Sequence, residues 1–292
     1  MKHFKFYAVL SCFLICCISQ AQDAPQPSPG NNNSLLWEVS GNGLAKPSYI
    51  FGTYHMLCKE QFVIKDKVKN ALEKAAGIVT EVNFLDSAEI ASMQKMMTSN
   101  KKLTETLNAA EQKEMDEALR AYGLSLKQAD NFSLTLLYSL TALKAINCPP
   151  ADVKMIDMEL MQIAKGKGKS LQALETLAGQ TSILGKAYSL QDVLQQMRNK
   201  EEMKKLYAQL AASYLAEDIV LLDKLLKHPA FMNKEQEKYM LTMRNHDWVT
   251  QMPAMMKNTS LFFAVGAGHL WGNDGIITLL IKKGYTLKPV FQ

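Results

Sequence analysis

The chain has 292 residues, which is enough for one large domain or two small ones. Its hydrophobic fraction of 48% and charged fraction of 21% are ordinary for a globular protein. The net charge of +5 is small, and no basic stripe with interleaved aromatic residues occurs, so the composition argues against nucleic-acid binding.

Residues 1–21 have the anatomy of a secretory signal peptide. Lys2 and Lys5 form a basic start, and residues 7–18 form an apolar run too short to span a bilayer as an ordinary helix. Ser-Gln-Ala at residues 19–21 is a small-x-small cleavage site. We therefore expect cleavage near Ala21 and a periplasmic or secreted protein without a further transmembrane segment. An uncleaved anchor is the alternative.

The cysteines support the same compartment. Three of the five lie in the signal segment, and Cys17 follows a poor lipobox because Cys16 replaces the usual Gly or Ala, which disfavours lipidation. Cys58 and Cys148 remain after cleavage, an even number in an oxidising compartment. One disulfide is predicted, and two buried free thiols are the alternative.

Residues 22–34 are rich in Pro, Asn and Gly and read as a flexible linker, so we place one folded domain at residues 35–292. Residues 35–39 are predicted to form a strand that turns through Gly-Asn-Gly at 41–43. The next strand, residues 49–54, is antiparallel to the first if the two form a hairpin.

A strand–helix–strand unit follows. Residues 63–76 have apolar positions at helical spacing and end at a Gly, and residues 78–82 form a short apolar strand. A right-handed crossover makes this strand parallel to residues 49–54, with both carboxyl ends at one edge of the sheet. His55 follows the first of these strands, and Glu81 lies near the end of the other. A buried acid inside an apolar strand is costly unless it is paired or functional.

Residues 84–250 are predicted to form a mainly helical insertion. A short strand at 171–175 ends at Glu175, which is either a loop acid or a site residue. Seventeen methionines, most of them in this region, are typical of adaptable core filler, with an apolar groove as the alternative. The expected helices are 86–97, 111–122, 130–146, 151–164 and most of 182–250, with a break near His228-Pro229.

The last segment repeats the first unit. Residues 261–265 form a predicted strand that ends in Gly266-Ala267-Gly268-His269, and helix 274–283 and strand 285–290 follow. The fold class is therefore α/β. We expect a central mixed sheet built from two strand–Gly-x-x-His–helix–strand halves, with the helical insertion as a cap.

Taken together, these residues resemble the TraB/GumN family, which includes the TIKI-type proteases. The resemblance runs from Leu35 to Val290 and implies an α/β core shared with erythromycin-esterase-like and ChaN-like proteins. TIKI-type members are described as metal-dependent proteases, whereas other branches are linked to peptide-pheromone inhibition or have no established activity. The matching pieces are Leu36-Trp37, Gly52-Thr53-Tyr54-His55, Glu81, Asp157, Leu174-Glu175-Thr176 with Gln180, Arg244-Asn245 with Trp248, and Gly266-Ala267-Gly268-His269-Leu270.

The residues suggest two mechanisms. In the first, His55, Glu81 and His269 hold a divalent metal such as Mn, Co or Zn, which activates a water molecule and polarises a carbonyl. Arg244 then stabilises the oxyanion, and Asn245 orients the substrate or a ligand. In the second, no metal is needed: His55 acts as a general base on water, oriented by Glu81.

We expect the substrate to lie against the glycine-rich turns, where backbone and ligand can approach closely. The predicted contacts are Gly52, Thr53, Gly266 and Gly268, with Glu175 as a spare ligand. The sequence lacks His-Glu-x-x-His, Gly-x-Ser-x-Gly and Cys-x-x-Cys. These absences argue against serine-hydrolase and thioredoxin-like chemistry, and the set of His55, Glu81, His269 and Arg244 predicts an exported, metal-dependent hydrolase of peptide or ester bonds. The alternative is a non-catalytic periplasmic protein that binds or inhibits a peptide or a metal complex.

Overall fold

The computed structural model describes residues 33–291. The predicted signal peptide, the alternative lipidation site Cys17 and all but the last two residues of the predicted linker lie outside the described residues. Within the linker prediction, Ser34 is buried, and its hydroxyl donates a hydrogen bond to the carbonyl oxygen of Val290 (2.7 Å). The packed structure therefore includes at least one residue before the predicted start at Leu35.

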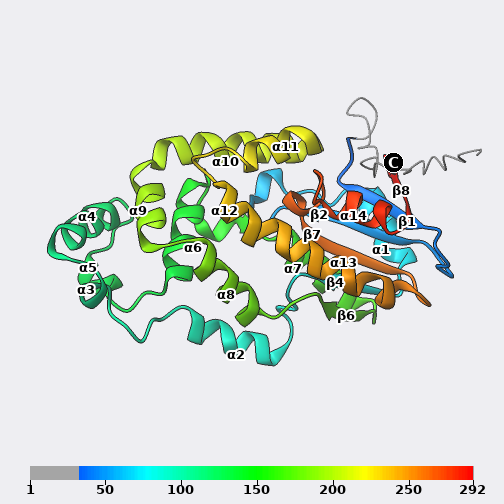
Figure 1. Cartoon of the computed structure of the whole chain (residues 1–292), viewed down its shortest axis with the longest axis horizontal. Coiled ribbons are helices and arrows are strands. Elements are labelled where there is room, and N and C mark those ends of the chain that lie inside the picture. The colour runs from blue at the N-terminus through cyan, green and yellow to red at the C-terminus, as the bar shows by residue number, and fades with distance from the viewer. Residues whose placement is uncertain (1–32, 292) are drawn as a thin grey trace, which may run out of the picture.

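A six-stranded mixed sheet forms one end of the molecule, and helices cover it and extend to the far end (Figure 1). The strand order is β6-β4-β7-β2-β1-β8. The four strands from β6 to β2 are parallel, whereas β1 is antiparallel to both β2 and β8. The strands are β1 (Leu36–Ser40), β2 (Ser48–Thr53), β4 (Gly77–Thr80), β6 (Ser170–Ala173), β7 (Leu261–Gly266) and β8 (Thr286–Pro289).

Burial follows the position of each strand in the sheet. The central strands β2 and β7 are continuous apolar runs in which every residue is buried, as expected for parallel strands covered on both faces. The edge strands β6 and β8 alternate exposed and half-buried residues. The predicted hairpin of β1 and β2 is confirmed by its antiparallel register.

The two predicted halves interleave in the sheet. Helix α1 (Asp66–Lys74) connects β2 to β4, and α14 (Ile276–Lys282) connects β7 to β8. However, β7 inserts between β2 and β4, so the strands of one half are not neighbours. Hydrophobic periodicity defines where a strand runs but not which strand lies beside it, because pairing depends on contacts between residues far apart in the sequence.

The insertion is helical, as predicted, although it also contributes β6 to the main sheet. Asp86 and Asn108 cap α2 and α4 through their side chains, and the chain breaks at His228 and Pro229. The helices of this region are α2 (Ser87–Met96), α3 (Leu103–Thr106), α4 (Ala109–Arg120), α5 (Leu126–Ala129), α6 (Leu134–Ala145), α7 (Ile156–Gly166), α8 (Leu177–Ala187), α9 (Leu190–Arg198), α10 (Lys200–Leu215), α11 (Ile219–Leu226), α12 (Lys234–Glu237), the π-helix η3 (Lys238–Thr242) and α13 (Met243–Met256).

The helix predicted at 151–164 begins later than expected. The chain first makes the 3-10 turn η2 (Pro150–Asp152) and the short strand β5 (Val153–Lys154), and α7 starts only at Ile156. Strand β5 pairs with β3 (Leu57–Cys58), which follows the first Gly-x-x-His motif. This long-range pairing overrides the local helical propensity, and it places Asp157 in the first turn of α7 beside that motif.

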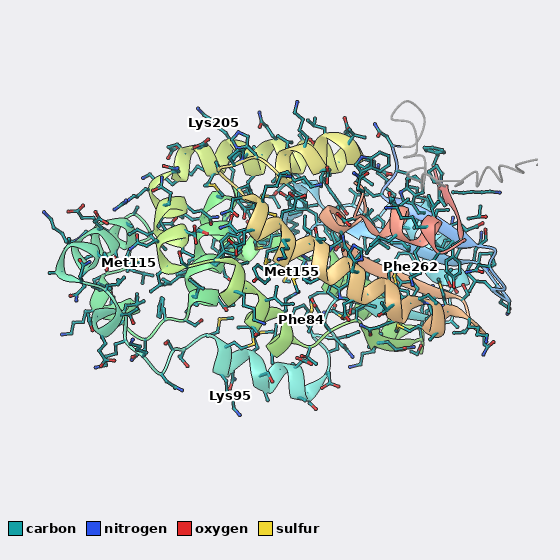
Figure 2. The ribbon with its side chains drawn as sticks, in the orientation of Figure 1. Phe84, Lys95, Met115, Met155, Lys205 and Phe262 are labelled. Carbon is teal, nitrogen blue, oxygen red and sulfur yellow. A yellow bond between two sulfur atoms is a disulfide. The ribbon has the colours of Figure 1, made fainter. Side chains whose placement is uncertain are left out.

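The predicted disulfide is present. Cys58 and Cys148 are bonded, with a Cα–Cα distance of 6.0 Å, and join β3 to the chain that follows α6. A second, smaller core lies at the far helical end, where Figure 2 labels Met115. Within residues 33–291, no helix has both the length and the apolar character needed to cross a bilayer.

Candidate active site

Three neighbouring parallel strands direct the predicted site residues to one edge of the sheet. Because β2, β7 and β4 run the same way, His55, His269 and Glu81 all follow carboxyl ends of strands. The predicted convergence is therefore present. A Cβ atom built on Gly266 would lie 3.1 Å from Oε1 of Glu81 and 3.3 Å from Nε2 of His55, and 3.5 Å from Cδ2 of His269. A larger residue at position 266 would require these side chains to shift, so the glycine favours their close approach.

His269 is buried and held in one tautomer. The Nδ2 of Asn245 donates to the backbone carbonyl oxygens of Asp274 (2.8 Å) and His269 (3.3 Å), so its Oδ1 must accept the hydrogen from Nδ1 of His269 (2.6 Å). The Nε2 atom then carries a lone pair, which accepts a hydrogen bond from Nη1 of Arg244 (3.1 Å). Burial, followed by the Arg244 charge, lowers the pKa of His269 to about 3, so the ring is neutral.

Arg244 joins the other groups of the site. Its Nη2 donates to Oε2 of Glu81 and to Oε1 of Glu175, each at 2.5 Å, and its Nε donates to Oε2 of Glu175 (3.3 Å). Its Nη1 donates to His269 and to the carbonyl oxygen of Met240 (2.9 Å). A guanidinium has five N–H groups, and all of them are used. The oxyanion contact predicted for Arg244 therefore has no free donor in this arrangement.

The surroundings of Arg244 fix its position. Met240 belongs to the π-helix η3, a rare conformation that often occurs at functional sites, and its carbonyl oxygen faces the guanidinium. On the other side, the guanidinium lies 4.7 Å from the ring centroid of Trp248, which in turn lies 4.4 Å from the His269 ring. Only 5% of the Arg244 side chain is exposed, so its charge requires the two carboxylates.

The two carboxylates that share Arg244 differ in pKa. Burial raises the pKa of Glu81, but the charge of Arg244 and a hydrogen bond from the backbone N–H of Gly266 (2.7 Å) outweigh it, so the net shift is downward. For Glu175 burial dominates, and the net shift is upward. The Nε2 of Gln180 donates to both carboxylates, each at 3.0 Å. Glu81 is therefore an anionic anchor, and Glu175 completes the cage around the guanidinium.

His55 stands apart from this cage. Its Nδ1 donates to Oδ2 of Asp157 (3.0 Å), and Thr53 donates to the other oxygen of the same carboxylate (2.6 Å). The His55 side chain is 56% exposed, and within residues 33–291 its Nε2 has no hydrogen-bond partner. Protein burial lowers the pKa of His55, but the Asp157 carboxylate reverses this and raises it to about 9.

The donor set does not fit a three-ligand metal centre. Nε2 of His269 and Oε2 of Glu81 accept hydrogen bonds from Arg244, and the backbone of Gly266 uses Oε1 of Glu81. Of the two imidazoles, that of His55 alone keeps an open nitrogen, Nε2. In the described part of the chain, no group of three or more His, Cys, Asp or Glu side chains is arranged to hold a metal. A guanidinium also places positive charge where an Mn, Co or Zn ion would sit.

The residues predicted to contact substrate play different parts in the structure: some line a cavity, and others pack against or hold neighbouring side chains. Gly52 packs against the second motif, because a Cβ there would lie 2.7 Å from Leu270, and it thereby brings the two motifs together. Thr53 holds Asp157. Gly266 and Gly268 line a cavity beside the site, as does Thr53. Glu175 holds Arg244 rather than facing that cavity.

Two cavities meet at the site. The Phe84 cavity, of about 330 Å³, is lined by Phe84, Met96, Met155 and other residues near α2 and α8. The Phe231 cavity, of about 230 Å³, is lined by Phe231, residues of α10 and α11, and the Gly266–His269 turn. Figure 2 shows Phe84 and Met155 between the sheet and the helical end.

Asp157 and Gln180 had no assigned role in the sequence analysis. Both occur among the residues that resemble the TraB/GumN family, and that was the signal that could have found them. Their partners were not evident, because Asp157 lies 102 positions from His55 and Gln180 lies 99 positions from Glu81. A delayed start of α7 and a helix after β6 bring these pairs together.

A family model described as TraB/PrgY/gumN matches residues 35–289. A "Metalloprotease TIKI homolog" from Amphimedon queenslandica is 22% identical over 321 residues, an alignment that covers 87% of this chain and 61% of that protein. The chain thus spans less than two thirds of this relative, and no solved structure matches it significantly. Because the family model covers nearly all of the described fold, the chain belongs to the TraB/PrgY/gumN family.

Proposed function

We propose that this protein is a hydrolase of peptide bonds in which His55 is the general base. One observation carries the proposal: the imidazole is anchored through Nδ1 to the buried carboxylate of Asp157, its Nε2 has no hydrogen-bond partner among residues 33–291, and the side chain lines two cavities. A base held by a carboxylate, with its second nitrogen free for a substrate or water, is the arrangement that general-base catalysis requires.

The residues suggest the following sequence of steps. Neutral His55 accepts a proton from a water molecule at Nε2 as the water oxygen attacks the scissile carbonyl carbon. Asp157 stabilises the imidazolium that forms, and this cation lies beside the oxyanion of the tetrahedral intermediate. His55 then returns the proton to the leaving amine as the carbon–nitrogen bond breaks. An ester is cleaved by the same steps, with His55 returning the proton to the leaving oxygen, which departs as an alcohol.

In this mechanism Arg244 and Glu81 position the site rather than contact the reacting carbonyl. Arg244 fixes the carboxylate of Glu81 and the ring of His269, and Glu81 holds the Gly266 turn that passes beside His55. Loss of either would displace the wall against which the attacking water sits. The distant relative named as a metalloprotease supports peptide-bond hydrolysis, whereas the bonding of Arg244 favours a mechanism without a metal.

A binding function is the second candidate, and one observation favours it. Every N–H of Arg244 is used within the protein, so this site lacks a charged donor aimed at a developing oxyanion. In this alternative the two cavities hold a peptide without cleaving it, or a metal complex binds through the open nitrogen of His55.

We also propose that the protein is exported. The basic start, the short apolar run and the cleavage site of residues 1–21 support export. The disulfide between Cys58 and Cys148 is consistent with an oxidising compartment. Intact-mass analysis of the exported protein should give a chain that begins at Gln22, and a retained Met1 would contradict this.

Incubation of the purified mature chain with a random peptide library, read by mass spectrometry, tests the hydrolase proposal. We expect cleavage by the wild-type protein and a loss of at least about 100-fold in His55→Ala, the usual contribution of a general base. His228→Ala is the matched control, because His228 lies in an exposed loop. Equal thermal unfolding of both variants would exclude misfolding. Cleavage retained in His55→Ala would refute the proposed role.

A further inference from the structure

The two cavities share part of their lining and extend from it toward different helices. His55, Met56, Tyr138, Met240 and Arg244 line both of them. The Phe84 cavity extends from this shared wall toward α2 and α8, and the Phe231 cavity extends toward α10 and α11. In Figure 1, α10 and α11 run along the upper margin of the molecule, whereas α2 runs along the lower margin with α8 above it. The His55 side chain therefore borders both cavities.

Apolar side chains dominate the Phe84 cavity. Val82, Phe84, Leu177 and Leu184 line it together with several methionines. Its charged side chains belong to the site itself and are paired: Glu81 with Arg244, and Asp157 with His55. A charged substrate group placed in this cavity would find no free partner and would lose its hydration.

The Phe231 cavity has the same character. Leu210, Leu222, Leu226, Phe231 and Leu241 contribute to its apolar lining. Its ionisable lining groups are the histidines of the two motifs, Arg244 and the buried tyrosine hydroxyls. Burial keeps His269 neutral by lowering its pKa to about 3, and His55 and Arg244 are already paired with carboxylates, so this side also offers no unpaired charge to a substrate.

Methionines line the walls of both cavities. Met56 and Met240 contact both spaces, Met96 and Met155 belong to the Phe84 cavity, and Met232 belongs to the Phe231 cavity. The flexible thioether side chain adapts to different apolar shapes. Such a lining favours a class of apolar side chains over one particular residue.

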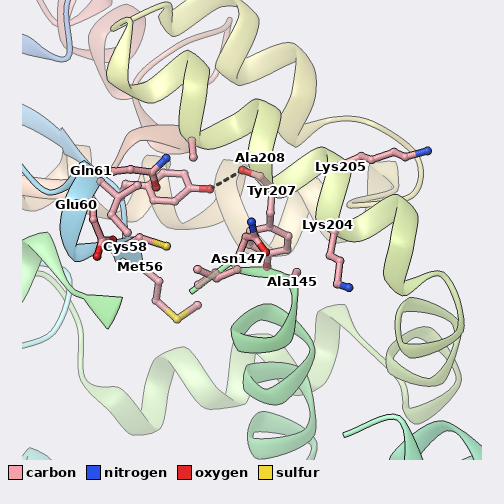
Figure 3. A pocket seen from close by; sticks show the side chains of 14 residues that line it. Met56, Cys58, Glu60, Gln61, Ala145, Asn147, Lys204, Lys205, Tyr207 and Ala208 are labelled. Atoms are coloured by element: carbon pink, nitrogen blue, oxygen red, sulfur yellow. Dashed lines mark hydrogen bonds between the residues drawn. The ribbon is translucent and has the colours of Figure 1, made fainter. Parts of the chain in front are cut away.

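A third pocket beside the disulfide differs in character. It has a volume of about 500 Å³ and includes Glu60, Lys204 and Lys205 in its lining, and Figure 3 shows Lys205 extending away from the hollow. In the same view the hydroxyl of Tyr54 donates to the carbonyl oxygen of Tyr207 (3.5 Å). Charged side chains are therefore available on the neighbouring surface but do not enter the two cavities at His55.

We propose that the substrate is an extended peptide segment with an apolar side chain on each side of the bond that lies at His55. Successive side chains of an extended chain point in different directions, which matches two cavities that extend from one centre toward different helices. Each cavity suits a side chain rather than a folded domain, since small-molecule pockets are typically about 300–1,000 Å³. This inference rests on the proposed function for its reaction and on the cavities for its specificity.

Binding is measured separately from turnover, with peptides in which a reduced amide replaces the scissile bond. Four peptides of equal length carry Leu–Leu, Leu–Lys, Lys–Leu or Lys–Lys around that bond, and calorimetry gives their affinities for the mature wild-type protein. We expect Leu–Leu to bind at least about tenfold more tightly than each of the others, because a charge without a partner is costly in an apolar cavity. Equal affinities, or no binding by any of the four, would overturn the proposal.

Two charge insertions test the two cavities separately. Met155→Lys places a cation at the Phe84 cavity, and Leu226→Lys places one at the Phe231 cavity. Each variant should bind more tightly a peptide whose Glu side chain occupies the cavity that carries the new lysine. One variant should therefore prefer Glu–Leu and the other Leu–Glu. The same preference in both variants, or no change in either, would contradict the assignment.

The chain offers a matched control for each insertion. Met243→Lys and Leu221→Lys change exposed residues, 51% and 42% accessible respectively, outside both cavity linings. Both controls should keep the wild-type order of affinities. Thermal unfolding checks that the four variants fold, and Met155 is itself 38% exposed, so its substitution is tolerated.

The outcome also separates this inference from the hydrolase proposal. Tight binding of the Leu–Leu analogue without cleavage of the normal peptide would refute hydrolysis and leave the binding preference in place. Cleavage of peptides regardless of charge at the two positions would support hydrolysis and refute the preference. Tighter binding of a simple fatty-acid chain than of Leu–Leu would refute the peptide as the occupant.

Discussion

At the scale of single residues, the His55–Asp157 pair is the feature on which the proposed chemistry depends most directly. Asp157 sits in the first turn of α7, where the positive end of the helix dipole stabilises its carboxylate. That carboxylate holds the Nδ1 hydrogen of His55 and raises the pKa of the ring to about 9. The base is therefore charged at neutral pH in the free protein and becomes competent as the pH rises.

We expect the cleavage rate to rise with pH through about 9, and Asp157→Asn to move this limb toward lower pH. The direction follows because the substitution removes the negative charge that favours the imidazolium, while the amide oxygen still accepts from Nδ1. The measurement is kcat/KM against pH, with an NMR titration of the His55 ring as a readout independent of turnover.

The surface pair of His246 and Asp274, with 2.8 Å between Nε2 and Oδ1, provides a matched control. Asp274→Asn removes a carboxylate charge from beside a histidine, His246, that lies away from His55. It should leave the pH limb in place. An unchanged His55 titration in Asp157→Asn would contradict the assigned pairing.

Arg244→Met should lower the free energy of unfolding by about 3–5 kcal/mol, because it leaves buried carboxylates without their partner. Glu81 is 5% exposed, and the guanidinium is its main counter-charge. Urea unfolding gives the loss directly. The double variant Arg244→Met/Glu81→Gln should recover part of it, because the carboxylate no longer needs compensation.

The comparison is Arg198→Met, which breaks an exposed ion pair with Glu114. Exposed pairs contribute about 0–1 kcal/mol, so this variant should unfold nearly as the wild type does. Similar losses in Arg198→Met and Arg244→Met would show that the buried cage does not provide the stability assigned to it.

At the scale of elements, the disulfide connects two walls of the site. Cys58 belongs to β3, just after His55, and Cys148 follows α6, whose Tyr138 and Ala142 line both cavities. The bond closes a segment of 90 residues, for which the chain-entropy model gives about 4–5 kcal/mol. The disulfide therefore supports both stability and the relative placement of β3 and α6.

Cys58→Ser/Cys148→Ser should lower the unfolding free energy by up to about 4–5 kcal/mol and raise KM more than it lowers kcat. KM should change more than kcat because His55 and Asp157 stay paired while the cavity walls loosen. Urea unfolding and steady-state kinetics measure the two effects, and the wild-type protein under reducing conditions should behave like the variant. Unchanged stability would contradict the prediction.

At the scale of the whole molecule, the two motif histidines give stability opposite dependences on pH. Burial and Arg244 lower the pKa of His269 to about 3, whereas Asp157 outweighs burial and raises that of His55 to about 9. An unfolded histidine titrates near 6.5, at about the reference value. As the pH falls below 6.5, the unfolded chain takes up a proton that folded His269 refuses, so stability decreases. As the pH rises above 6.5, the unfolded chain releases a proton that folded His55 retains, so stability again decreases.

We therefore expect the unfolding free energy to be greatest near pH 6.5. The lowered pKa of Glu81 steepens the acid limb below about 4.3, its reference value. The alkaline limb should be shallow, because His55 is 56% exposed and solvent screens its partner. Urea unfolding between pH 3 and 10 measures the curve. A stability that increases continuously toward pH 10 would contradict the assignment of His55.

Removal of divalent metals should leave both activity and the unfolding midpoint unchanged. The expectation follows because Arg244 uses the lone pairs of Glu81 and His269 that a metal would need, and a ligand that does not bind the native state cannot stabilise it. Dialysis against a chelator, followed by addition of Mn, Co or Zn, is the measurement, with a known zinc peptidase as the control. If chelation abolished activity and addition of one of these metals restored it, the result would support the metal mechanism predicted from the sequence.

The local features of the site were predictable from the sequence. Continuous apolar runs indicate buried strands, a glycine allows close approach, and the histidine that ends each run must leave the sheet at a strand end. These patterns placed His55, Glu81 and His269 at one edge, and the Asp86 and Asn108 caps were evident for the same local reason. The cysteine count in a chain predicted to be exported was likewise enough to pair Cys58 with Cys148.

Only the tertiary structure decided how these side chains are used. The order of parallel strands, with β7 between β2 and β4, depends on contacts between residues about 200 positions apart. Such contacts produce no periodic pattern in the sequence. The pairing of Asp157 with His55 required a long-range strand pair to delay α7. Similarly, Arg244 is suitable for an oxyanion by residue type, but its five N–H groups are used by partners from four separate segments. Residue type sets what a side chain can donate, whereas the packed neighbours determine what remains free to react.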